Sequence, residues 1–135
     1  MPEWYFTAIQ TAMDGFFIDC AHGKILDVND SYCNMVGYSR EELLSMNVQE
    51  IDVGYINSFG TIHNMHNWMR SVGSVKTDVI QRHKSGKLME MSLSVKCLDV
   101  GIGLFFCFQR DVTEERKAFR QLIESEDRYR SLVEL

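Results

Sequence analysis

Cysteine and histidine are the residues of this chain best suited to metal binding or catalysis. The cysteines are Cys20, Cys33, Cys97 and Cys107; they form no C-x-x-C pair, and their gaps fit neither a zinc ribbon nor a disulfide scaffold. Three of them lie among apolar residues, so we expect reduced, mostly buried thiols, which are typical of a cytosolic protein.

The two histidines that could act together are His63 and His66, three residues apart on one expected helix. They would supply two metal ligands, and no third ligand is evident. The chain shows no suggestive Ser-His-Asp arrangement, no P-loop and no G-x-G-x-x-G. We therefore expect no metal site and no intrinsic catalysis.

The composition indicates one ordinary globular domain. The chain has 135 residues, of which 45% are hydrophobic and 24% are charged, with one proline. Its net charge is −5, from 14 basic and 19 acidic residues, and no run of lysine or arginine interrupts it. A nucleic-acid-binding face, which needs a basic stripe, is not expected.

The sequence also predicts no membrane segment. No stretch approaches the roughly 18 apolar residues of a membrane span. The first residues, MPEWYFTAIQ, carry an acid early and no basic region, unlike a signal peptide. A cytoplasmic protein is the expectation.

Several elements must position these residues. Apolar spacing predicts a lead-in helix over residues 1–13, and apolar runs predict a hairpin of strands at 16–20 and 25–28. Short helices follow from capping signals at residues 29–31 and from a capping box that starts at Ser39. Residues 60–71 carry Met65, Trp68 and Met69 on one face of a longer helix.

The last half of the chain is predicted to be β structure followed by one helix. Residues 75–83, 89–97 and 104–111 read as strands joined by tight turns, and alternation is clearest from Met89 to Cys97. Thr113 is the expected N-cap of an exit helix over 113–135. Its apolar residues have alternating spacings of three and four, interrupted by Glu126: Phe119, Leu122, Tyr129 and Val133.

This order predicts an α+β fold, a five-stranded antiparallel sheet with short helices on one face. The second face also needs cover. The lead-in helix, the exit helix or a partner chain could provide it.

Five short motifs, in this order and at these spacings, resemble a PAS domain, the sensory module common in bacterial signalling proteins. They are DGFFID at 14–19, HGKILDVN at 22–29, GYSREEL at 37–43, HKSGK at 83–87 and RDVTEERK at 110–117. The resemblance implies a PAS core over 14–112, flanked by the two helices. The tail resembles the opening of another PAS domain, which implies a segment of a longer sensor, most often a histidine kinase.

The resemblance also implies roles for particular residues. A small-molecule pocket would lie between the sheet and the longer helix, lined by Phe16, Ile18, Met65, Trp68 and Met69. Asp111 and Thr113 would couple the sheet to the exit helix. That helix would pair two copies in a homodimer through the seam of Phe119, Leu122, Tyr129 and Val133.

The resemblance names no cofactor for this chain. A cysteinyl-flavin adduct needs an Asn-Cys-Arg-type motif, whereas Cys33 is followed by Asn34. Heme needs an axial ligand, and neither His63 nor His66 falls where heme-binding relatives place theirs; both are expected on a solvated face. The methionine-rich interior is either an adaptable pocket or a plain core.

Asp19 departs from the family pattern, which usually has a hydrophobic residue there. Alternation places its side chain on the face with Phe17, where an unpaired carboxylate would be costly, and no partner is evident from sequence. Two functions remain open: a ligand-binding sensor that relays its signal to a kinase, and a ligand-free dimerisation module.

Overall fold

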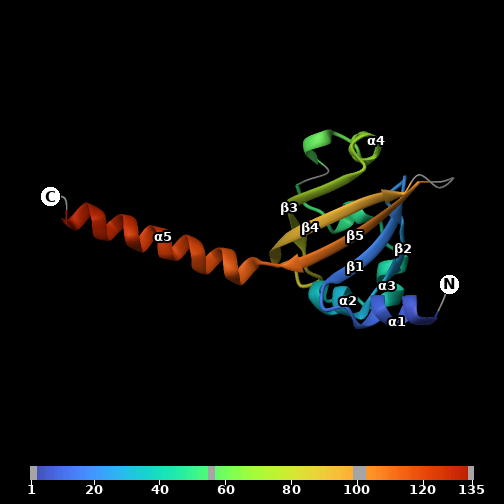
Figure 1. The fold of residues 1–135 in the computed structure, drawn as a ribbon, viewed down its shortest axis with the longest axis horizontal. Helices are drawn as coiled ribbons and strands as arrows, with labels where there is room; N and C mark the ends of the chain where they lie inside the picture. The colour runs from blue at the N-terminus through green and yellow to red at the C-terminus, as the bar shows by residue number, and fades with distance from the viewer. Residues whose placement is uncertain (1–2, 55–56, 99–102, 134–135) are drawn as a thin grey trace.

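A computed structural model gives the structure of residues 3–54, 57–98 and 103–133 (Figure 1). The ends of the expected flanking helices, residues 1–2 and 134–135, lie outside this range. Within it the strands are β1 (Gly15–Cys20), β2 (Ile25–Val28), β3 (Ser74–Arg82), β4 (Leu88–Leu98) and β5 (Leu104–Asp111). The α-helices are α1 (Glu3–Thr11), α2 (Asp30–Val36), α3 (Arg40–Leu44), α4 (Ile62–Val72) and α5 (Thr113–Val133). Two 3-10 turns, η1 (Val48–Glu50) and η2 (Asn57–Phe59), precede α4.

The five strands form one antiparallel sheet in the order β2-β1-β5-β4-β3. The predicted hairpin is β1-β2 and the predicted meander is β3-β4-β5. Pairing of β1 with β5 joins them, and brings Phe17 opposite Cys107 and Asp19 opposite Phe105. The predicted α+β architecture is confirmed.

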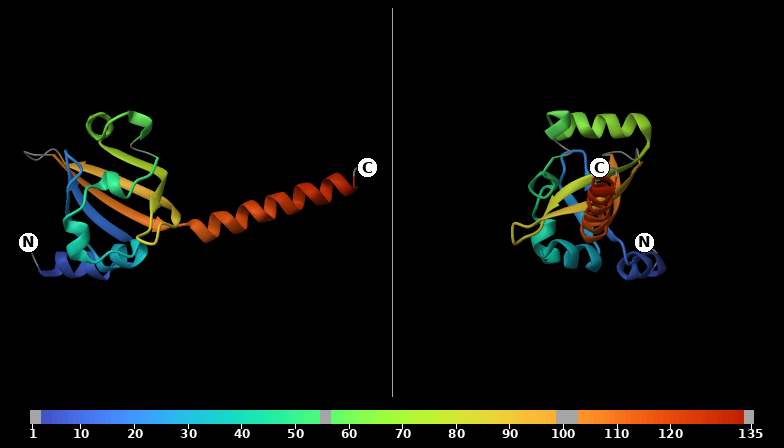
Figure 2. Two further views of the ribbon diagram at one scale, coloured as in Figure 1. Left: turned by 180° about the vertical axis from the view of Figure 1, so that it is seen from behind. Right: turned by 90° about the vertical axis from the view of Figure 1, so that its left-hand side faces the viewer.

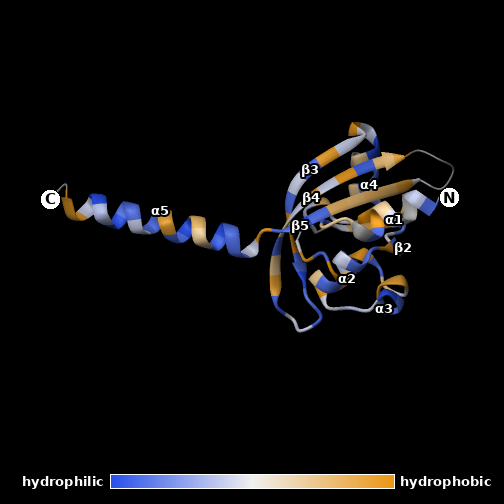
Figure 3. Ribbon diagram, turned by 60° about the horizontal axis from the view of Figure 1, so that its bottom comes forward, coloured by the Kyte–Doolittle hydropathy of each residue, from blue (hydrophilic) through white to orange (hydrophobic). Residues whose placement is uncertain are grey.

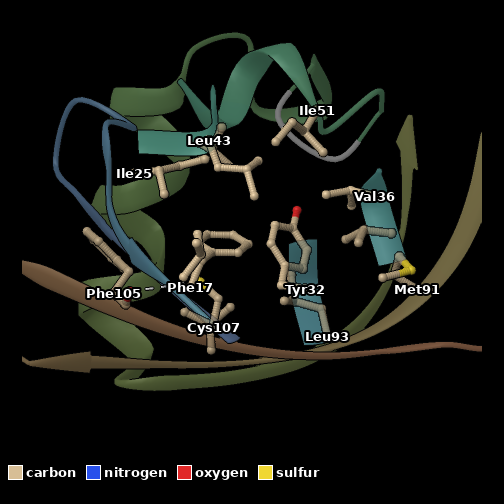
Figure 4. Close-up of a cluster of buried hydrophobic side chains, with 14 of the residues drawn as sticks. Phe17, Ile25, Tyr32, Val36, Leu43, Ile51, Met91, Leu93, Phe105 and Cys107 are labelled. Atoms are coloured by element: carbon tan, nitrogen blue, oxygen red, sulfur yellow. Dashed lines mark hydrogen bonds between the residues drawn. The ribbon is translucent and has the colours of Figure 1, made fainter. Parts of the chain in front are cut away.

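The core fills the space between one face of the sheet and the helices α2, α3 and α4 (Figures 2 and 4). Strand β4 supplies it through strict alternation, with Met89, Met91, Leu93 and Val95 buried. Tyr32 of α2 is fully buried at its centre.

Helices α2 and α3 begin at the predicted capping residues, and α2 ends at the predicted glycine. The Asn29 side chain accepts a hydrogen bond from the Tyr32 backbone at the start of α2. Ser39 and Glu42 form the reciprocal capping box of α3. Gly37 closes α2 with a φ of 80°, a left-handed conformation that favours glycine.

Helix α5 projects away from the sheet and buries none of its residues (Figures 1 and 2). The exit helix therefore does not cover the second face of the sheet, which corrects one expectation. Among the described helices, none is both long and apolar enough to cross a bilayer.

Candidate functional site

A cavity of about 20 Å³ lies between α4 and the sheet. Apolar side chains from α4 and the strands form most of its wall. The polar or ionisable side chains that also line it are Asp19, Asp52, His66, Gln81 and Cys107. This volume holds about one water molecule. Small-molecule pockets start at about 300 Å³, so this cavity is too small for such a ligand and is closed in that sense.

The residues expected to line a pocket divide between the two faces of the sheet. Met65 and Met69 of α4 do line the cavity. Phe16 and Ile18 do not: Phe16 contacts Phe106 and Phe108, with ring centroids 6.2 and 4.8 Å away, on the other face.

The expected lining set is therefore corrected for β1, whose cavity-lining residues are Phe17 and Asp19. The sequence of β1 is apolar at consecutive positions, so hydrophobicity alone does not identify the inner face.

Trp68 is also absent from the cavity wall. Its side chain is 41% exposed, and its ring contacts Phe59 at a centroid distance of 5.4 Å. The inner face of α4 instead consists of Ile62, Met65, His66 and Met69. On the helical wheel His66 and Trp68 flank opposite sides of this stripe, and the structure buries the histidine side.

Asp19 and His66 form a buried pair between β1 and α4. The His66 Nε2 atom lies 3.2 Å from Asp19 Oδ2, and the Cys107 thiol donates to Asp19 Oδ1 at 3.7 Å. The prediction that His66 lies on a solvated face is wrong, because only 2% of this residue is exposed. His63, by contrast, is exposed.

Burial governs the titration of these groups. It raises the pKa of Asp19, although the hydrogen bond and the charge of His66 oppose the shift. It raises the pKa of Cys107 well above its ordinary value, and the neighbouring Asp19 adds to the effect. Cys107 is therefore a thiol hydrogen-bond donor and not a thiolate nucleophile.

A second polar chain crosses the core beside this pair. The Tyr32 hydroxyl donates to Gln81 Oε1 at 3.0 Å, and Gln81 Nε2 donates to Gln109 Oε1 at 2.7 Å. These glutamines were not among the residues expected from the sequence. Their place in the alternating strands was the available signal, since each falls in an inward-facing register.

Within the described residues, the cysteines form no disulfide and belong to no cluster that could hold a metal ion. All four are free thiols there, and no group of three metal-binding side chains is present in those ranges. Cys107 is buried, whereas Cys20, Cys33 and Cys97 are half-buried, so the expected burial is met in full at one position.

The junction between β5 and α5 is fastened to β4 at Glu90. The Glu90 backbone N–H donates to the Thr113 hydroxyl at 2.9 Å, and the Val112 N–H donates to the Glu90 carbonyl at 2.9 Å. Thr113 also donates to Asp111 Oδ1 at 2.5 Å, and the same oxygen accepts from the Thr113 N–H.

Thr113 is thus the first residue of α5 and not its N-cap, which corrects the predicted capping role. The Asp111 carboxylate accepts from the free backbone N–H at this end of the helix. The Thr113 hydroxyl instead links helix and sheet.

Two ion pairs continue this attachment along the first turns of α5. Arg116 contacts Asp78 of β3 at 2.7 Å, and Arg120 contacts the Glu90 carboxylate. The hydrogen bond to Asp78 raises the pKa of Arg116. Beyond Arg120, the described part of α5 makes only i,i+4 contacts of its own, including the pair of Glu126 with Arg130 at 2.9 Å.

The predicted seam lies along the projecting part of α5 and is exposed (Figure 3). Phe119, Leu122, Tyr129 and Val133 are each between 60% and 67% exposed. With Glu126 they follow a heptad pattern, which is the pattern of helices that pair.

Comparison with known proteins identifies relatives over nearly the whole chain. The family described as "PAS domain" matches residues 13–114. A PAS domain from a two-component sensor histidine kinase has 31% identity and a TM-score of 0.68, covering 81% of this chain and 96% of that one. A domain of a sensory box sensor histidine kinase/response regulator from Geobacter sulfurreducens has 27% identity and a TM-score of 0.65, covering 80% of this chain and 91% of that one.

A curated relative extends beyond this domain. Sporulation kinase E of Bacillus subtilis (strain 168) is 29% identical over 126 residues, which are 91% of this chain. The chain spans 16% of the length of that relative.

Proposed function

The chain belongs to the PAS domain family, and from this membership we propose that it is a sensory or relay module. It passes a change in its core, or in its contact with a second copy, through α5 to a downstream effector. The relatives with kinase names support a histidine kinase as that effector. In this proposal the domain itself is not catalytic, and any catalysis resides in the effector. The whole protein would be cytoplasmic.

The observation that carries the proposal is the attachment of α5 at Glu90. The backbone and side chain of this one β4 residue contact Val112, Thr113 and Arg120. A shift of β4 relative to β5 must therefore move the base of α5. Asp111 and Thr113 would be the coupling residues.

Pairing of two copies along α5 would supply the output. The exposed seam of Phe119, Leu122, Tyr129 and Val133 has no cover within the described chain, and a second copy of the same helix would bury it. Glu126 weakens the middle of this seam, which suits a joint that changes its pairing.

A ligand-free module is the second candidate, and the closed cavity favours it. At about 20 Å³ the cavity would need to expand before it held a small molecule. Native mass spectrometry with a visible absorption spectrum distinguishes the two. An excess mass or a chromophore band supports a sensor, whereas an apo mass and a colourless protein support a relay.

Replacing Leu122 by Asp tests the pairing. The change places a carboxylate from each copy in the seam and removes two buried leucines, so the dimer dissociation constant should rise at least about 100-fold. Sedimentation velocity measures this constant. Gln121→Asp adds the same charge to the same helix outside the seam and should leave the constant unchanged. An unaltered dimer in Leu122→Asp would show that α5 is not the interface.

A further inference from the structure

The inner face of α4 has one polar attachment to the sheet. Its buried residues are Ile62, Met65, His66 and Met69, and of these only His66 carries a polar side chain suited to directional hydrogen bonds. His66 Nδ1 lies 2.9 Å from the Ala21 carbonyl oxygen, and Nε2 lies 3.2 Å from Asp19 Oδ2. The imidazole also stacks on Phe105, with a centroid distance of 4.0 Å and an interplanar angle of 17°.

These contacts fix the number of protons in the pair. A carbonyl oxygen only accepts, so Nδ1 carries a proton. Nε2 then either donates from an imidazolium to the Asp19 carboxylate, or accepts from a neutral Asp19 carboxyl group. Each arrangement has one proton between Nε2 and Oδ2. Without it two acceptors face each other, beside an uncompensated buried negative charge.

We propose that Asp19 and His66 form a proton-dependent latch that holds α4 on the sheet, and that loss of the shared proton releases the helix. The latch would control the opening of the closed cavity beneath α4. It is a property of the core and does not depend on pairing along α5.

The groups around the pair favour retention of the proton. On the acidic side, Cys107 contacts Asp19 directly and Asp52 lines the same cavity. Burial raises the pKa of Tyr32 of α2 and of Cys97 of β4, and the charge of Asp19 adds a smaller contribution to both shifts.

Among the described residues, one further cation, Arg70, lies near the pair. The Arg70 guanidinium lies 5.9 Å from the centroid of Phe105, the ring on which His66 stacks. Within the described part of the chain, His66 is the cation that acts on Asp19 directly, so loss of the shared proton would leave a poorly compensated negative charge there.

The direction of the pH dependence follows from Asp19. Burial raises the pKa of this carboxyl group above that of an unfolded aspartate, about 3.9. The contribution of the shared proton is therefore lost as the pH rises through this higher folded value. The equilibrium constant for opening of α4 should increase with pH, by at most about tenfold per unit, the limit for one proton.

Hydrogen–deuterium exchange of α4 peptides between about pH 4.5 and 8.5, corrected for intrinsic exchange, tests the latch. Opening should increase with pH in the wild-type chain. In Asp19→Asn the carboxamide can donate to Nε2 without a titrating proton, so the pH dependence should disappear while protection remains. His63→Gln alters the exposed histidine of the same helix and should retain the wild-type pH dependence.

Two results would overturn the latch: opening of wild-type α4 that is independent of pH, or an unchanged pH dependence in Asp19→Asn. Imidazole ¹⁵N chemical shifts of the wild-type chain give a check that needs no variant. They should show protonated Nδ1 in His66 at neutral pH. A bare Nδ1 there would contradict the proton count.

Discussion

Asn29 connects three elements through one buried side chain. Its Oδ1 accepts from the backbone N–H groups of Phe16 and Tyr32, each at 2.9 Å. Its Nδ2 donates to the carbonyls of Ile9 and Asp14 at 2.9 and 3.0 Å. The sequence predicted only the helix-capping part of this role, because the other partners are distant in the chain.

We predict that Asn29→Ala lowers the free energy of unfolding by about 2–5 kcal/mol, since it leaves two buried N–H groups unsatisfied, that of Phe16 and that of Tyr32, which is the capped N–H of α2. Urea denaturation measures the loss. Ser39→Ala removes an exposed cap and should cost about 1 kcal/mol. Equal losses in the two variants would show that the buried contacts of Asn29 add nothing.

The buried pair shows what sequence could predict at single residues. Alternation correctly placed Asp19 on the face of Phe17, where an unpaired carboxylate would be costly, but the sequence did not identify its partner. That partner is 47 residues away. The helical stripe placed His66 only at its border, where burial depends on which side of α4 meets the sheet.

At the scale of elements, the end of α2 is fitted to the β3-β4 turn. A Cβ atom added at Gly37 would lie 2.5 Å from the His83 ring. That ring is held in place, because His83 Nδ1 accepts from the Ser85 N–H at 3.0 Å. Gly37 therefore meets two demands, a positive φ and a close approach.

Gly37→Ala should destabilise the fold by about 2–4 kcal/mol, from left-handed strain together with overpacking against His83. Thermal or urea unfolding measures it. Gly86→Ala is the matched control, since Gly86 also has a positive φ but its added Cβ would meet open space. The control should cost only about 1–2 kcal/mol. A loss in Gly37→Ala no larger than that would remove the role of the His83 contact.

Most helices and strands could be predicted from the sequence, because hydrophobic periodicity and capping residues indicated the same elements. Alternation identified β4, and capping residues identified α2 and α3. Two features needed the tertiary structure. The inner face of β1 cannot be identified from the sequence, because both faces of this strand carry apolar residues. The hydrogen bonding of Thr113 depends on Glu90, which is 23 residues earlier in the chain.

At the scale of the whole molecule, the chain consists of a packed core of sheet and helices from which α5 projects (Figure 2). The core is tied internally by buried polar pairs, while the arm exposes its apolar seam. The packed core and the projecting helix are thus separate parts, so a conformational change in the core could alter the pairing of α5. In the proposed relay, Glu90, Asp111 and Thr113 connect the core to α5.

The dimer dissociation constant of Thr113→Val, measured by sedimentation velocity, tests this connection most directly. Residue 113 lies outside the seam, so the change can affect pairing only through the attachment of α5 to β4. We predict a rise of about fivefold or more, the lower end of typical coupling between sites. Thr77→Val, on the neighbouring strand β3, should leave the constant unchanged. A wild-type constant in Thr113→Val would contradict the relay.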